Sequence, residues 1–397
     1  KCCGDGLTAA ALRRLERLGL DPGEVPSWEP VSETFIQVPD GRCEGFPMPA
    51  DGSLHAVAAK RMDLDAALVS AAVRQGVTLL EGRAVKLAEP VWTGQAVELT
   101  LEGGERMQAP YVIAADGMWS AVVRTLGMRE PGYLGDWHAL RQYFTNVGPQ
   151  ARKGMWVWFD DELVPGYAWS FPLKGGMANV GFGVPRSAGK RTGELKKVWA
   201  EFLSRPPMRD VLGPDAEPAE PLRTWPIPAR LRSTQLSGVA GRVLVVGDAA
   251  RAVDCLTGEG IAQALESGEL AAQAATTAGI LAPDRAEFQY REAIRTGMAV
   301  DDKMASLVSR ILATEKGRSG WIRVAGANGY MKRHFIRWLF EDYPRAALFT
   351  PGRWERGMLN RQGAFATGTD GGGTGSSRST PSGRDRPLTR INLLPRR

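Results

Sequence analysis

The segment VLVVGDAARAVDCLTGEGIAQALESGELAA (residues 243–272) joins an apolar run to an acidic turn, a glycine loop and a helical pattern. If the apolar run is a strand, Asp248 lies at its carboxyl end, where a carboxylate can accept hydrogen bonds from sugar-like hydroxyls. The amides near Gly258, Gly260 and Ile261 would begin a helix, whose N-terminus carries about half a positive charge and favours anionic groups. The segment predicts a site for a polar ligand, and an ordinary strand–loop–helix connection is the alternative.

Two further segments place a polar residue beside a strand or at the start of a helix. In YVIAADGMWSAVVRTLG, an apolar strand pattern runs into Asp116 and Gly117, after which Ser120 can cap a short helix. In KRMDLDAALVSAAVRQGVTLLEGRAV, Arg61 opens a helical pattern that leads to a strand reaching Val85. Both segments also fit a purely structural role, as a turn and as a surface arginine.

A row of aromatic residues could line an apolar site. In YAWSFPLKGGMANVGFG, Tyr167, Trp169 and Phe171 alternate along a strand pattern, so all three rings project from one face. Gly181 and Gly183 follow on the next strand pattern and would leave room opposite the rings. The arrangement fits a cavity for an elongated apolar ligand, and a packed core is the alternative.

Composition narrows the classes of function. The 397 residues are 43% hydrophobic and 24% charged, which indicates a globular protein large enough for two domains. The four cysteines and three histidines lack the spacing of a zinc site, so no metal is expected. The net charge of +6 is uneven and reflects a basic tail without a recognition motif, so no nucleic-acid partner is expected. No apolar run approaches the ~20 residues of a membrane-spanning helix, and a reducing cytoplasm is the default location.

The pattern of elements predicts a mixed fold. Helical periodicity is expected over residues 7–18, 62–77, 192–204, 260–278 and 284–315. Strand patterns dominate residues 138–184 and fit an antiparallel sheet inserted into a domain that otherwise alternates strands and helices.

The order of these motifs resembles the geranylgeranyl reductase family, which are flavoproteins of the p-hydroxybenzoate hydroxylase fold. The resemblance rests on K-x-C-G-x-G at the start, R-x-x-x-D at Arg61, the ADG turn, Y-x-W-x-F-P followed after eight residues by G-x-G, and GDAA with TGEGI. The likeness runs from Lys1 to about Leu281 and less clearly to about residue 365. The last two motifs are specific when they occur together.

The resemblance implies an α/β fold in which a substrate domain interrupts an FAD-binding domain. The expected parts are an FAD-binding Rossmann-like domain (1–30, 55–130 and 238–282), an antiparallel β substrate domain (31–54 and 131–237), a C-terminal helical region (283–365) and a disordered basic tail (366–397). In the family, the KCCGDG turn follows a βαβ unit that holds a G-x-G-x-x-G phosphate loop. Neither that loop nor the acidic residue for the adenosine ribose occurs here, so a fragment that lacks its first βαβ unit and binds FAD poorly is expected.

The resemblance also implies roles for individual residues. Cys3 would lie near the reactive face of the flavin and is the candidate catalytic residue, Val85 would approach the adenine through its backbone, and Asp248 would meet the ribitol. The expected cofactor-binding set is Cys3, Gly4, Gly6, Arg61, Val85, Asp116, Gly117, Asp248, Gly258, Gly260 and Ile261. The expected lining of the isoprenoid cavity is Tyr167, Trp169, Phe171, Gly181 and Gly183.

The chain departs from the family pattern in two places. The family usually has glycine where this chain has Arg251, and Asn-Pro where it has Asp254 and Cys255. Loss of the proline is expected to loosen the loop beside the flavin.

The reaction that the resemblance implies is reduction of carbon–carbon double bonds in a geranylgeranyl or other polyprenyl chain. FAD would supply the hydride, and either NAD(P)H or a ferredoxin would reduce the FAD. A flavin monooxygenase or halogenase of the same fold is one alternative, and a non-catalytic remnant is the other.

The segment NGYMKRHFIRWLFEDYPR, near residues 328–345, has an aromatic face with basic neighbours if it is helical. Such a helix can lie at a membrane surface, where an isoprenoid substrate resides, so peripheral membrane contact is one expectation. The alternative is that the helix packs this face against the protein itself.

Overall fold

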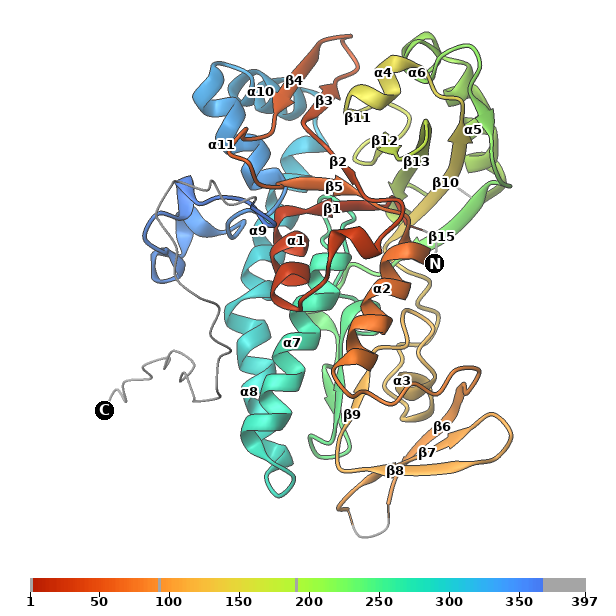
Figure 1. The fold of residues 1–397 in the computed structure, drawn as a ribbon, viewed down its shortest axis with the longest axis vertical. Coiled ribbons are helices and arrows are strands. Elements are labelled where there is room, and N and C mark those ends of the chain that lie inside the picture. The colour runs from red at the N-terminus through yellow and green to blue at the C-terminus, as the bar shows by residue number, and fades with distance from the viewer. Residues whose placement is uncertain (1–2, 92–93, 190–191, 367–397) are drawn as a thin grey trace, which may run out of the picture. The chain divides into compact units, whose positions relative to one another are not determined.

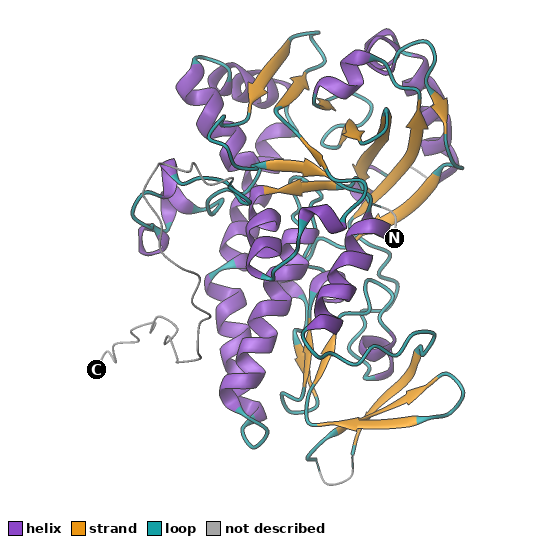
Figure 2. Ribbon diagram, viewed as in Figure 1, coloured by secondary structure: helices purple, strands orange, loops and turns teal. Residues whose placement is uncertain are grey.

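The computed structural model describes residues 3–91, 94–189 and 192–366. The tail expected to be disordered therefore lies, from residue 367 on, outside the described residues. Helices and strands are mixed along the chain (Figure 1 and Figure 2). Within the described residues, the strands form four separate sheets.

The largest sheet has eight strands and contains the aromatic row. Its strands are β3 (Glu33–Gln37), β4 (Cys43–Pro47), β10 (Trp137–Thr145), β11 (Met155–Trp158), β12 (Tyr167–Leu173), β13 (Met177–Pro185), β14 (Glu217–Pro218) and β15 (Arg223–Ile227). All neighbouring strands are antiparallel except β11 and β3, which pair in parallel. The expected antiparallel sheet is present, and the hairpin of β3 and β4 extends it. Buried residues of helices α4 (Pro149–Lys153), α5 (Thr192–Ser204) and α6 (Pro206–Leu212) share one apolar core with this sheet.

Three smaller sheets make up the rest of the strands. They contain β1 (Gly6–Thr8), β5 (Ala56–Ala58) and β2 (Glu29–Pro30); β16 (Ser237–Gly238), β17 (Val243–Val245) and β9 (Val112–Ala114); and β6 (Val85–Pro90), β7 (Val97–Leu101) and β8 (Arg106–Ala109). The buried β17 pairs in parallel with β9, which fits its unbroken valine-rich sequence. The chain then turns through the short η4 (Gly247–Ala250) toward α7 (Ile261–Ala278).

The first helix packs against α7. Helix α1 (Ala9–Arg17) is capped by Thr8, whose hydroxyl accepts from the Ala11 N–H. Its buried face, including Leu12 and Leu15, shares one apolar core with Ile261 at the start of α7 and Leu64 in α2 (Arg61–Arg74). This core holds the N-terminal segment close to the N-terminus of α7.

The helical C-terminal part contains more breaks than the sequence pattern predicts. The expected helix over 284–315 is two helices, α8 (Pro283–Thr296) and α9 (Met298–Leu312), separated at Gly297. Helix α8 runs beside α7 (Figure 1), and its Tyr290 hydroxyl donates to the Val245 carbonyl at 2.6 Å. The contact ties the C-terminal helices to the strand that precedes Asp248.

Helix α11 (Gly329–Leu339) uses its aromatic face inside the molecule. Phe335 contacts Phe46 of β4, and Trp338 contacts Trp321 of α10 (Glu315–Ala325). Arg337 is buried and donates to the backbone carbonyls of residues 358, 359 and 361. The helix therefore packs Phe335 and Trp338 against the protein, as the alternative expects, and contact of this segment with a membrane stays a prediction. Among the described helices, none has the length and apolarity to cross a bilayer.

Candidate functional site

The N-terminal segment is anchored by a buried carboxylate. Asp5 is fully buried between Gly4 and Gly6 and has a φ of +65°, a conformation that Asp tolerates better than most residues. It accepts hydrogen bonds from the Tyr143 hydroxyl at 2.6 Å, the Asn179 amide at 2.8 Å and the Arg61 N–H at 3.2 Å. Burial raises the pKa of Asp5, although the bonds from Tyr143 and Asn179 oppose this effect.

The aromatic row lies directly across from the two glycines. In the register of β12 and β13, Tyr167 pairs with Gly183 and Trp169 with Gly181. The ring centroids of the row follow one another at 6.0 and 6.2 Å, so the three rings share one face. A Cβ on Gly181 would lie 2.8 Å from Trp169 Cε2 and 2.5 Å from the Leu140 carbonyl oxygen, which only glycine avoids.

A side-chain amide connects this row to the N-terminal segment. Asn179, on β13, accepts from the Trp169 indole N–H at 3.0 Å and donates to the Cys3 carbonyl at 2.8 Å. Since Asn179 also donates to Asp5, the aromatic row and the Cys3–Gly6 turn are held in one fixed arrangement.

The N-terminus of α7 holds a carboxylate from its own loop. Glu259 Oε1 accepts from the Ile261 N–H at 2.7 Å and the Ala262 N–H at 3.3 Å. Burial raises the pKa of Glu259 to about 7, and these two N–H groups and Arg61 act in the opposite direction. The helix end therefore accommodates an acidic group, as its dipole predicts.

These segments enclose one cavity, here called cavity 1, with about 920 Å³ of empty space including its opening. It gathers twelve of the residues singled out from the sequence: Cys3, Gly4, Gly6, Arg61, Tyr167, Trp169, Phe171, Gly183, Asp248, Gly258, Gly260 and Ile261. Burial raises the pKa of the Cys3 thiol, while Arg61 acts in the opposite direction.

Four residues of the sequence prediction lie elsewhere. Gly181 faces the Trp169 ring rather than the cavity. Asp116 accepts from the Ala121 N–H at 2.7 Å at the start of α3 (Ala121–Thr125), and Gly117 follows it with a φ of +80°. Val85 packs at the edge of the apolar core around β17. The cofactor roles of these last three residues remain predictions.

A second cavity, cavity 2, adjoins the first and is mostly apolar. It has about 1000 Å³ of empty space, including its opening, and shares Gly6, Tyr167, Phe171, Thr257 and Glu259 with cavity 1. Its far wall is formed by helices α10 and α11 together with β3 and β11, through Ile36, Val157, Trp321, Ile322, Phe335, Trp338 and Leu339. The aromatic face of α11 is thus part of this wall.

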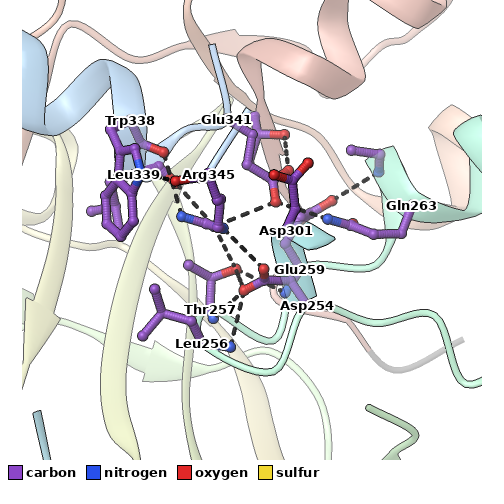
Figure 3. A network of polar contacts seen from close by, with 12 residues as sticks. Asp254, Leu256, Thr257, Glu259, Gln263, Asp301, Trp338, Leu339, Glu341 and Arg345 are labelled. Carbon is purple, nitrogen blue, oxygen red and sulfur yellow. Dashed lines mark hydrogen bonds and ion pairs between the residues drawn. The ribbon is translucent and has the colours of Figure 1, made fainter. Parts of the chain in front are cut away.

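A polar cluster fixes the loop before α7 (Figure 3). Asp254 Oδ1 accepts from the Leu256 and Thr257 N–H groups, and Oδ2 accepts from Arg345 Nε at 2.9 Å. Arg345 also pairs with Glu341 at 3.3 Å. The loop expected to be loose without its proline is therefore held by Asp254, and burial raises the pKa of the neighbouring Glu341 to about 8.

The other departure from the family pattern has a backbone explanation. Arg251 has a φ of +54°, the left-handed region that glycine adopts without strain. Its side chain pairs with Glu130 at 2.6 Å and lies 3.7 Å from the Tyr133 ring centroid. These contacts compensate for the strain at a position where the family pattern has glycine.

The residues of cavity 1 fit a flavin. Gly4 and Gly6 carry no side chain, so the backbone of the N-terminal turn can approach a flat ring beside the aromatic row. The Ile261 and Ala262 amides offer donors and a positive helix end to an electron-rich ring edge. In this structure Glu259 uses those donors, so a cofactor that binds them competes with this carboxylate.

Comparison with known sequences agrees with this reading of the site. The profile of the FAD binding domain family matches residues 34–272. The chain belongs to the geranylgeranyl reductase family of FAD-dependent oxidoreductases, as the order of its motifs predicts.

Individual relatives include two reductases. The menaquinone reductase of Mycolicibacterium smegmatis is 31% identical over 304 residues, covering 70% of this chain and 68% of the relative. Digeranylgeranylglycerophospholipid reductase 1 of Methanopyrus kandleri is 29% identical over 350 residues, covering 82% and 87%.

Solved structures share the fold. A geranylgeranyl bacteriochlorophyll reductase-like protein from Thermoplasma acidophilum aligns over 89% of both chains, with a TM-score of 0.71 and 21% identity. The halogenase PltM, in complex with phloroglucinol and FAD, aligns over 86% of this chain and 75% of its own, with a TM-score of 0.61 and 17% identity. At these identities the likeness establishes the fold alone.

Several residues of the site were not predicted from the sequence. Asp5, Asn179 and Glu259 hold or line cavity 1, although none was singled out. For Asp5, a position between two glycines was a usable signal, because glycine-rich turns favour Asp at positive φ. Nothing local distinguishes Asn179, whose partners lie up to 176 residues away.

Proposed function

We propose that this protein reduces carbon–carbon double bonds in a polyprenyl chain that lies in cavity 2 and reaches into cavity 1. The observation that carries the proposal is the shared wall, by which the mostly apolar cavity 2 adjoins the residues that fit a flavin. The relatives named as menaquinone and digeranylgeranylglycerophospholipid reductases support a substrate with a polyprenyl chain.

Some residues of the chain would hold the cofactor, and others would bind the substrate. When FAD is bound, it supplies the hydride. The Cys3–Gly6 turn, Arg61, Asp248 and the N-terminus of α7 hold the cofactor, and Trp169 is kept in place beside it by Asn179. The apolar walls of cavity 2 bind the chain by excluding water, which contributes about 25 cal/mol for each Å² of buried apolar surface.

A polyprenyl chain resides in lipid, so we also propose that the protein works in peripheral contact with a membrane. Flotation with anionic vesicles at low salt is the test. Protein that stays at the bottom of the gradient would restrict the substrate to forms carried in solution.

Anaerobic turnover tests the main proposal. The holoenzyme, reduced with dithionite, is given a C20 all-trans isoprenoid alcohol and menaquinone in separate reactions, and mass spectrometry counts the hydrogens added. Products that gain two hydrogens for each reduced bond are expected with at least one substrate. Halogenated or oxygenated products, formed only with halide or oxygen, would instead support the halogenase or monooxygenase alternative.

A variant that fills cavity 2 locates the chain. Leu339→Trp adds an indole to the wall of cavity 2 and is expected to abolish turnover of the C20 alcohol while sparing a C10 alcohol. Tyr330→Trp is the matched control, because residue 330 lies on the same helix and is 66% exposed. Equal losses with both alcohol lengths would place the chain outside cavity 2.

A further inference from the structure

Glu259 lies where the two cavities adjoin. Five described residues line both cavities: Gly6, Tyr167, Phe171, Thr257 and Glu259. Only Glu259 among them carries a carboxyl group. A substrate double bond that lies where the two cavities adjoin would therefore be near Glu259 and near no other carboxyl group among these five residues.

The other two proton-bearing side chains at this junction are already engaged. The Tyr167 hydroxyl donates to the Thr257 carbonyl, and burial raises the pKa of this phenol. The Thr257 hydroxyl donates to Asp254 Oδ1 at 2.9 Å. Neither has a proton directed to the cavity.

The remaining carboxylates of cavity 1 are also poorly placed. Asp5 is held by three hydrogen bonds in the N-terminal turn, and Asp248 does not line cavity 2. Glu259 in contrast is bound only through Oε1, by the Ile261 and Ala262 amides, among the hydrogen bonds that the structure describes.

We propose that Glu259 is the proton donor for the double-bond reduction, an inference that rests on the proposed function. Its carboxyl proton goes to the less substituted alkene carbon, and the π electron pair forms the new C–H bond. Reduced FAD, when bound, would supply the hydride for the methyl-bearing carbon, so the alkene would gain one proton and one hydride at the expense of the two electrons of the cofactor. The Glu259 carboxylate then regains a proton from water.

The electrostatic surroundings raise the pKa of this carboxyl group to near neutral pH. Charged and titratable groups face it from its own loop and from four other segments: Cys3, Arg61, Tyr167, Asp254 and Glu341. Arg61 favours the carboxylate, whereas Asp254 and burial favour the acid, and the resulting pKa is about 7. A general acid with a pKa near the working pH is the most effective kind.

The binding of FAD would strengthen this role. A cofactor edge that takes the Ile261 and Ala262 amides removes the two hydrogen bonds that favour the Glu259 carboxylate. The pKa of Glu259 would then rise further, and the side chain would be free to turn into the cavities.

Two measurements on the holoenzyme test the assignment. With glutamate labelled at its carboxyl carbon, NMR of the oxidised, FAD-bound protein should show a carboxyl titrating at or above about pH 7 that is missing in Glu259→Gln. In anaerobic turnover of the C20 alcohol, Glu259→Gln should lower kcat about 100-fold, the lower range for general acid catalysis. KM and the rate of flavin reduction by dithionite should stay within about twofold, and the fall of the wild-type rate above about pH 7 should disappear.

The controls separate this idea from the proposed function. Glu266 lies on α7 and also has a raised pKa, but it lines neither cavity. The variant Glu266→Gln should therefore behave as wild type. A wild-type enzyme that adds no hydrogen to any polyprenyl substrate refutes the reductase function itself. If wild type is active and Glu259→Gln keeps its rate and pH profile, Glu259 is not the donor. If Glu259→Gln loses FAD, Glu259→Asp decides: an unchanged kcat with the shortened carboxyl overturns the assignment, and a reduced kcat supports it.

Discussion

Replacing Gly181 with alanine should disturb the aromatic row, although Gly181 itself lines neither cavity. A Cβ at this position would lie 2.8 Å from Trp169 Cε2 and 2.5 Å from the Leu140 carbonyl oxygen. The second neighbour is backbone of β10, so rotating one side chain cannot relieve the overlap. The Trp169 ring must shift toward cavity 1, and β10 and β13 must separate slightly.

The size of the effect follows from two contributions. Overpacking by a methyl group costs about 1–3 kcal/mol when backbone has to move. A shifted indole also weakens the hydrogen bond between Trp169 Nε1 and Asn179, at 3.0 Å, which is worth about 1 kcal/mol. We therefore expect Gly181→Ala to lower the free energy of unfolding by about 2–4 kcal/mol.

Gly183→Ala is the matched control, two residues along the same strand. Its Cβ would meet only Trp137, at 3.7 Å, which is an ordinary contact. We expect a loss of stability below about 1 kcal/mol, but weaker binding of the polyprenyl substrate, because Gly183 lines cavity 1. Urea unfolding midpoints measure the stability of both variants. Equal stabilities for the two variants would refute the close approach of Trp169 to Gly181.

Three further predictions concern single side chains. Trp169→Ala should lower the free energy of unfolding by about 3–5 kcal/mol and impair turnover of a C20 substrate while FAD stays bound. Loss of FAD without a selective effect on substrate turnover would mean that Trp169 is a core residue and does not line the substrate site. Asp248→Ala should weaken FAD binding by about 1.5–3 kcal/mol. Unchanged flavin content after dialysis would mean that Asp248 has only a structural role in the turn. The pKa of Glu259 is about 7 in the folded protein against 4.5 normally, so the folded state holds this proton more tightly and loses stability as pH rises through that window. Glu259→Gln should therefore be more stable than wild type by about 3 kcal/mol above about pH 8 and equal to it near pH 4, and an equal stability at both would mean that the carboxyl titrates normally.

The strands of the aromatic row show how far local pattern reaches. Alternation in β12 requires Tyr167, Trp169 and Phe171 to share a face, because successive side chains of a strand point to opposite sides. The tight turn at Gly175 and Gly176 then brings β13 back along β12, with Gly181 opposite Trp169. Both facts depend on residues close together in the chain, and so the sequence was sufficient for them.

Contacts between segments far apart in the chain could not be predicted from such local patterns. The aromatic face of α11 has the same sequence whether lipid or protein covers it, and only the fold places Phe335 and Trp338 at the wall of cavity 2. The loop before α7 lacks the family's proline, yet it is held by Arg345, which lies 91 residues after Asp254.

The sequence by itself determined that the three rings of the aromatic row share a face, because strand alternation imposes this locally, and the order of its motifs indicated the cofactor class through resemblance to a family. Tertiary structure alone decided that Glu259 stands between two cavities and that Asp5 binds Tyr143 from 138 residues away. The physical reason is that burial and long-range hydrogen bonds depend on the path of the whole chain. Burial, which that path decides, is the largest cause of the raised pKa of Glu259.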